Sequence, residues 1–172
     1  MAKTYERFED LPVWQEAVRL AENVYDMTES KAWTGSYSLR DQLERAALSV
    51  SNNIAEGFER GTTNELLSFL YISRGSAGEV RSMLCFIERR KSFVNFKSQI
   101  SNLKSIAESC SRQLRAWADH LQNSDIEGQR RLNDKTRSQY RSKKDAEEFQ
   151  RELMERLPSN HPLQKGKKNT SV

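Results

Sequence analysis

Four stretches of the chain place apolar residues three or four positions apart, the spacing that lines one face of an α-helix. We expect these helices at about residues 11–28, 36–59, 62–91 and 96–121. Asp10 can cap the first helix, and Thr62 with Glu65 forms a capping box at the start of the third. Short connections between long amphipathic helices favour antiparallel neighbours. The pattern therefore predicts an all-α protein, an up-down antiparallel four-helix bundle over residues 1–122.

The same spacing predicts which face of each helix points inward. The first helix should bury Trp14, Ala17, Val18, Ala21, Val24, Tyr25 and Thr28. The second and third should bury one stripe each, from Leu39 to Phe58 and from Leu66 to Ile87. The fourth has the most regular pattern, a heptad seam of Phe96, Ile100, Leu103, Ala107, Cys110, Leu114, Trp117 and Leu121. These four faces can share one core.

Residues 123–172 form a second region, a basic C-terminal extension. Residues 130–144 hold 7 basic residues and one acidic residue, so we expect flexible chain or solvated helix there. Residues 145–157 could form a short amphipathic helix through Phe149, Leu153 and Leu157, which Pro158 would stop. We therefore expect an extension that is partly disordered.

The composition argues against a membrane or secreted protein. No apolar run approaches the roughly 18 residues that span a bilayer. The first residues lack the apolar core of an export signal, so we expect a cytoplasmic protein. Cys85 and Cys110 are the only cysteines; they could pair, but buried reduced thiols fit their apolar surroundings better.

Residues with catalytic potential have simpler structural explanations. Glu56, Glu59 and Glu65 flank a turn between helices, where caps and solvated charges are commoner than an acid–base pair. His120 and His161 are far apart, and the chain has no Gly-rich phosphate loop or metal-ligand motif. The sequence predicts no catalytic residue, no metal, no cofactor and no small-molecule substrate.

Small and polar residues interrupt two of the helices. Ser49, Asn52 and Asn53 lie in the middle of the second, and Gly75, Ser76 and Gly78 in the middle of the third. Each glycine inside a helix costs on the order of 1 kcal/mol relative to alanine. Close approach of another helix could repay that cost. The two runs are therefore candidates for contact, within one chain or between subunits.

The net charge of +4 is unevenly distributed. Residues 1–66 carry 7 Lys or Arg against 12 Asp or Glu, whereas residues 67–122 carry 9 against 4. Residues 123–172 carry 12 against 8. This asymmetry indicates either an anionic partner or charge-complementary packing between chains.

The basic residues of the third and fourth helices can form one strip. Its expected members are Arg74, Arg81, Arg89, Arg90, Lys91, Lys97, Lys104, Arg112 and Arg115, with Arg130 and Arg131 of the extension. The strip is either an ordinary solvated face or a surface for phosphates, which Lys and Arg contact with little sequence preference.

Three segments resemble the bacterial four-helix-bundle proteins of the 23S rRNA intervening-sequence protein family. They are residues 8–28, 39–61 and 69–84, and they contain Val13-Trp14, Arg45-Ala46-Ala47, Asn53–Gly57 and Gly75-Ser76 at that family's recurring positions. The resemblance covers about residues 8–121 and implies the same bundle.

One branch of that family comprises the accessory variability determinants of diversity-generating retroelements. Resemblance to this branch implies a basic homopentameric barrel that binds RNA or DNA and a reverse transcriptase, and assists mutagenic cDNA synthesis without being an enzyme. Our leading hypothesis is therefore a non-catalytic, homo-oligomeric nucleic-acid-binding accessory protein. The alternative is a protein scaffold in which acidic helices of one chain pack against basic helices of the next.

Overall fold

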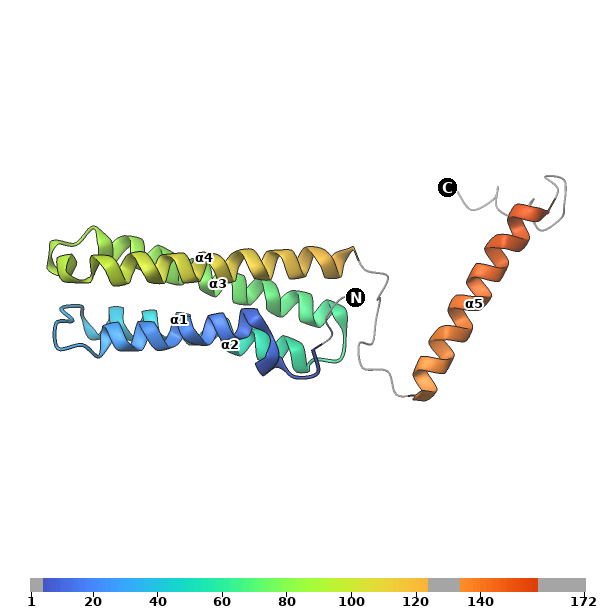
Figure 1. The fold of residues 1–172 in the computed structure, drawn as a ribbon, viewed down its shortest axis with the longest axis horizontal. Coiled ribbons are helices and arrows are strands. Elements are labelled where there is room, and N and C mark those ends of the chain that lie inside the picture. Colours follow the sequence, from blue (N-terminus) through green and yellow to red (C-terminus); the bar gives the residue numbers. More distant parts are fainter. Residues whose placement is uncertain (1–4, 124–133, 158–172) are drawn as a thin grey trace. The chain divides into compact units, whose positions relative to one another are not determined.

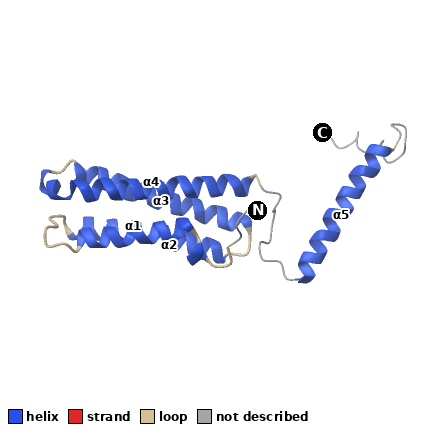
Figure 2. Ribbon diagram, in the orientation of Figure 1, coloured by secondary structure: helices blue, strands red, loops and turns tan. Residues whose placement is uncertain are grey.

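A computed structural model describes residues 5–123 and 134–157. The chain divides into two compact units, residues 1–130 and 131–172. The described part of the first unit contains four long helices, and that of the second contains one. Figure 2 shows helices and loops but no strand in the described ranges.

The first unit is the expected antiparallel four-helix bundle (Figure 1). Its helices are α1 (Pro12–Thr28), α2 (Tyr37–Glu59), α3 (Thr63–Glu88) and α4 (Lys97–Gln122). Each packs on the helix that follows it, and α4 packs back on α1. The prediction of the fold is thus confirmed, with two shifted ends: α3 stops at Glu88 rather than near Lys91, and α4 begins at Lys97.

Two of the four bundle helices, α2 and α3, begin with a side-chain cap. Thr62 Oγ1 accepts from the Glu65 backbone N–H at 3.2 Å, which confirms the N-cap half of the expected capping box, and donates to Glu65 Oε2 at 2.7 Å. Ser36 Oγ accepts from Leu39 N–H at 3.3 Å at the start of α2. The expected Asp10 cap is wrong, because Asp10 ends a short 3-10 helix (Phe8–Asp10) and Leu11 takes the capping position of α1.

The core follows the predicted stripes in α2, α3 and α4, except that Leu39, Trp117 and Leu121 at their ends are only half-buried. The first helix is rotated from the expectation: Val13, Leu20 and Met27 are buried, whereas Trp14, Val18 and Tyr25 are only half-buried. The apolar stripe of α1 is wide enough to contact both α2 and α4. The spacing of apolar residues therefore did not predict which part of the stripe is most deeply buried. The half-buried edge of α1, with Val18 and Tyr25, lines a surface groove described below.

The second unit contains α5 (Asp134–Arg156), which is longer than the helix expected at residues 145–157. Phe149 and Leu153 are exposed on it, and Lys143 pairs with Glu147 at 3.8 Å. An i,i+4 pair of this kind stabilises exposed helix only slightly. The disorder expected elsewhere in the extension concerns residues 124–133 and 158–172, which lie outside the described residues.

Candidate nucleic-acid interface

Buried aromatic side chains stabilise the turn between α3 and α4. A 3-10 helix, η2 (Lys91–Phe96), buries Phe93 and Phe96. The ring of Trp33, from the turn between α1 and α2, lies edge-on to both, with centroids 4.9 and 6.2 Å away. Thr34 Oγ1 donates to the Ser92 carbonyl at 3.2 Å, which ties the two turns together. The turn is therefore a fixed platform at one end of the bundle.

Four cations project from this platform, and we call them the cationic turn: Arg89, Arg90, Lys91 and Lys97. All four are exposed, and none has an ion-pair partner within the described part of the chain. Residues 84–104 contain five Lys or Arg residues and a single Glu. The cationic turn is therefore a local positive field with free guanidinium and ammonium groups.

Three other members of the predicted strip are already neutralised. Lys104 Nζ lies 2.8 Å from Glu88 Oε2, and this bond raises the pKa of Lys104, while nearby Arg81 lowers it. Arg112 pairs with Glu108 at 3.2 Å and Arg115 with Asp119 at 3.5 Å. These groups are less available to an external anion than the cationic turn.

The remaining members of the strip lie elsewhere. Arg74 and Arg81 are half-buried along α3 and have no ion-pair partner among the described residues. Arg130 and Arg131 lie outside the described residues. The strip thus divides into a free cationic end, a paired stretch on α4 and two isolated arginines on α3.

The polar run in α2 makes a hydrogen-bonded contact with α3. Ser49 Oγ lies 2.9 Å from Ser76 Oγ, and Asn53 Nδ2 donates to the Ser49 carbonyl at 2.6 Å and to Ser49 Oγ at 2.9 Å. Fully buried Ser73 donates through Oγ to the Val50 carbonyl at 2.7 Å. The polar residues therefore join two helices within the chain, with Asn52 exposed beside them.

The glycines of α3 do not take part in this contact. Gly75 and Gly78 are exposed, and a Cβ at either would meet nothing within 4 Å. Close approach within the chain therefore does not explain them, and only the alternative between subunits stays a prediction. The tight approach is at Gly57 instead, where a Cβ would lie 2.6 Å from Phe69 Cβ.

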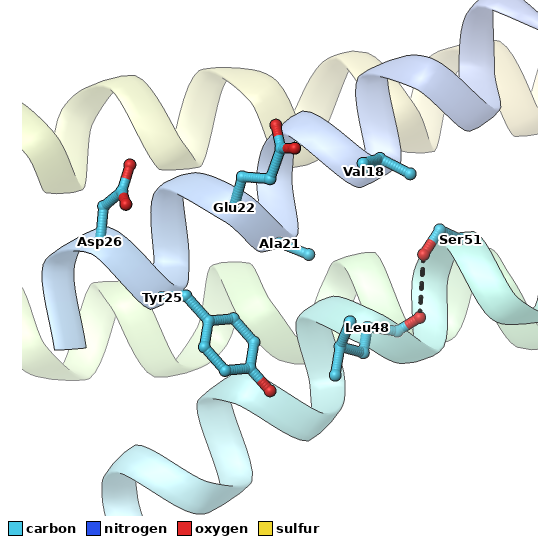
Figure 3. A pocket seen from close by; sticks show the side chains of 7 residues that line it. All are labelled: Val18, Ala21, Glu22, Tyr25, Asp26, Leu48 and Ser51. Atoms are coloured by element: carbon cyan, nitrogen blue, oxygen red, sulfur yellow. Dashed lines mark hydrogen bonds between the residues drawn. The ribbon is translucent and has the colours of Figure 1, made fainter. Parts of the chain in front are cut away.

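A shallow groove of about 320 Å³ lies between α1 and α2 (Figure 3). Its apolar floor comes from Val18, Ala21, Tyr25 and Leu48. Glu22 and Asp26 stand at its edge, and neither has a cationic partner among the described residues. Glu16, the remaining carboxylate of α1, and most carboxylates of α2 pair with arginines, so the groove concentrates free negative charge.

The two cysteines occupy different environments. Cys110 is fully buried in the core, and burial raises its pKa to about 12. Cys85 is exposed, so the expectation that it packs in the core is wrong. It lies one position beyond Leu84, which faces the core, and the α3 stripe continues at Ile87 rather than through Cys85.

We expect a maleimide to modify Cys85 rapidly in the folded protein and to modify Cys110 only after unfolding. At pH 8 a thiol with a pKa near 12 is ionised to only about one part in 10⁴, and the thiolate is the reactive form. Intact mass spectrometry with and without denaturant measures this directly. Equal labelling rates for both thiols would contradict the buried position of Cys110.

The described residues offer no cluster of three or more His, Cys, Asp or Glu side chains that could hold a metal ion. Within the same ranges, no helix has the length and apolar character needed to cross a membrane. One surface feature was not predicted from the sequence. Phe86 and Val94, beside the cationic turn, are more than half exposed to solvent. Phe86 falls between the inward positions Leu84 and Ile87, so the helical spacing alone could have predicted that it faces outward.

Comparisons with known proteins identify the bundle. The model of the 23S rRNA-intervening sequence protein family matches residues 9–116. A solved structure of a protein of unknown function from the S23 ribosomal protein family of Bacteroides thetaiotaomicron has a similar fold, with a TM-score of 0.55 and 14% sequence identity. The match covers 62% of this chain and 97% of that one. No curated protein matches the chain. Because the family model spans more than half of its residues, the chain belongs to the 23S rRNA-intervening sequence protein family.

Proposed function

We propose that this chain is a non-catalytic cytoplasmic protein that binds RNA through the cationic turn. The observation that carries the proposal is the set of four exposed cations without ion-pair partners in the described structure, held on a rigid platform. Free Lys and Arg side chains can replace the counterions condensed on phosphates, which drives binding without sequence preference. Exposed paired cations would first have to lose their carboxylate partners.

The proposal predicts salt-dependent RNA binding by the full chain. If all four cations of the cationic turn contact phosphates, the logarithm of the association constant should fall with the logarithm of salt concentration with a slope of about −3 to −4. Fluorescence anisotropy with a labelled RNA over a range of salt concentrations measures this slope. Absence of binding at low salt, or affinity independent of salt, would refute the proposal.

The resemblance to the accessory variability determinants supports a finer form of the proposal. In that form the chain assembles as a homo-oligomer, a pentamer by resemblance, and presents RNA to a reverse transcriptase. A ring would repeat the cationic turn around its axis and raise avidity. Native mass spectrometry tests the subunit number. A gene neighbourhood without a reverse transcriptase and a variable repeat would remove the polymerase from the proposal and leave RNA binding in place.

The groove between α1 and α2 favours a second candidate function, a protein scaffold. Its apolar floor and the free carboxylates of Glu22 and Asp26 suit a basic, apolar surface on another copy of the chain. Such an assembly should dissociate as salt rises, because the contacts are ionic at the edge. An oligomer that dissociates with salt, together with no RNA binding at physiological salt, would favour this candidate over the first.

A further inference from the structure

Phe86 is an exposed aromatic residue set among the free cations. It lies on the outer face of α3 one helical turn before Arg89 and Arg90, and its side chain is 53% exposed. The Arg90 guanidinium carbon lies 5.9 Å from the centre of its ring. Val94, in the 3-10 helix that follows, is also exposed. The cationic turn therefore has an apolar, aromatic surface at its edge.

This combination distinguishes between forms of nucleic acid. A duplex presents phosphates on its outside while its base faces are stacked and covered, so cations alone suffice to bind it. Single strands are bound by cations that follow the backbone together with aromatic rings on which unpaired bases stack. A phenylalanine ring in water beside a free arginine adds nothing to duplex binding but provides a face for a free base.

We propose that Phe86 is a stacking platform for an unpaired base of single-stranded RNA, and that Arg89, Arg90 and Lys91 hold the phosphates beside that base. The inference rests on the proposed function and names its substrate class. Solvent reaches the ring, because more than half of the surface of Phe86 is exposed. Arg90, whose guanidinium lies over the ring, can stay on that face or move to stack on the neighbouring base, since guanidinium groups also stack on nucleobases.

Tyr37 provides a matched control within the same chain. It begins α2 and is 83% exposed, so it is an even more accessible aromatic ring than Phe86. The charges nearest it in sequence are paired: Arg40 with Glu44 at 2.7 Å and Asp41 with Arg45 at 3.0 Å. Tyr37 thus has the exposure of a stacking residue, but the two arginines nearest it in sequence are held by carboxylates.

The test compares the affinity for an unstructured RNA of about 20 nucleotides with the affinity for the same RNA annealed to its complement. This length exceeds typical single-strand binding sites. The proteins are the full chain and the variants Phe86→Leu, Phe86→Trp and Tyr37→Leu. Phe86→Leu should weaken single-strand binding by about 5-fold to 100-fold, the loss of one base stack, and leave duplex binding unchanged. Phe86→Trp should keep or improve single-strand affinity, and Tyr37→Leu should change neither.

Other results would overturn the inference in distinguishable ways. If Phe86→Leu leaves both affinities unchanged, or weakens both equally, Phe86 is not a stacking platform, although the proposed function survives. If Phe86→Leu instead lowers the native mass, the ring contacts a second copy of the chain. If the unmodified chain binds neither RNA, the proposed function fails together with the inference. Leucine preserves the apolar character of the site, and thermal melting checks that each variant is folded.

Discussion

Reversing Arg89, Arg90 and Lys91 to glutamate together is expected to lower RNA affinity by roughly 100-fold or more at moderate salt. Each lost charge-assisted contact contributes on the order of 1 kcal/mol or more. The reversed charges also repel phosphates. The salt slope should become less negative by about 2 to 3, since each phosphate contact contributes about 0.7 to 0.9. Anisotropy titrations at several salt concentrations measure both quantities.

A matched triple variant separates a local site from the effect of overall charge. Arg45→Glu, Arg112→Glu and Arg115→Glu change the net charge by the same amount. Each of these arginines pairs with a carboxylate four positions away, at 3.0, 3.2 and 3.5 Å. We expect this control to lose much less affinity. An equal loss in both triple variants would mean that RNA responds to the field of the whole chain and not to the cationic turn.

The stability of the first triple variant also needs a control. Arg89 follows the last residue of α3. At this end of a helix a positive charge interacts favourably with the helix dipole and a negative charge interacts unfavourably. Glutamate near this end should cost about 0.3–1 kcal/mol per residue, without unfolding a bundle of this size. Arg89→Gln, Arg90→Gln and Lys91→Gln remove the charges with less of that cost. They should give an intermediate affinity loss if charge is the cause.

The sequence was sufficient for the fold because the helical spacing, the breaks and the Thr62 cap agreed. The seam from Phe96 to Leu114 is buried as expected, and Thr62 caps α3 through the Glu65 backbone N–H. The sequence did not predict which face of α1 is buried, because α1 packs against two other helices. The wide stripe of α1 serves both α2 and α4, so Val18 and Tyr25 border the groove instead of filling the core.

The candidate site was predictable only in part, since charge availability depends on partners. The pairs of Arg112 with Glu108 and Arg115 with Asp119 follow an i,i+4 spacing that the sequence contains. The pair of Lys104 with Glu88 joins residues sixteen positions apart on different helices, which requires the register of α3 against α4. Which cations lack an ion-pair partner can therefore be determined only from the packed helices.

Gly57→Ala is expected to destabilise the bundle although alanine is the better helix former. Gly57 is buried near the end of α2, and an added Cβ would lie 2.6 Å from Phe69 Cβ and 3.2 Å from Leu66 Cδ1. Phe69 Cβ is attached directly to the α3 backbone, so it cannot rotate away and the helices must separate locally. Overpacking of this kind costs about 1–3 kcal/mol, against a propensity gain of up to about 1 kcal/mol.

Gly75→Ala is the matched change with the opposite expected sign. Gly75 lies inside α3 with nothing within 4 Å of the added Cβ, so the propensity gain of about 1 kcal/mol should appear as added stability. Urea denaturation of both variants measures the two free energies of unfolding. Both changes reduce the freedom of the unfolded chain to the same extent. Their difference therefore isolates the α2–α3 contact at Gly57, and equal stabilisation by both alanines would mean that these helices do not approach as closely as the Gly57–Phe69 distance indicates.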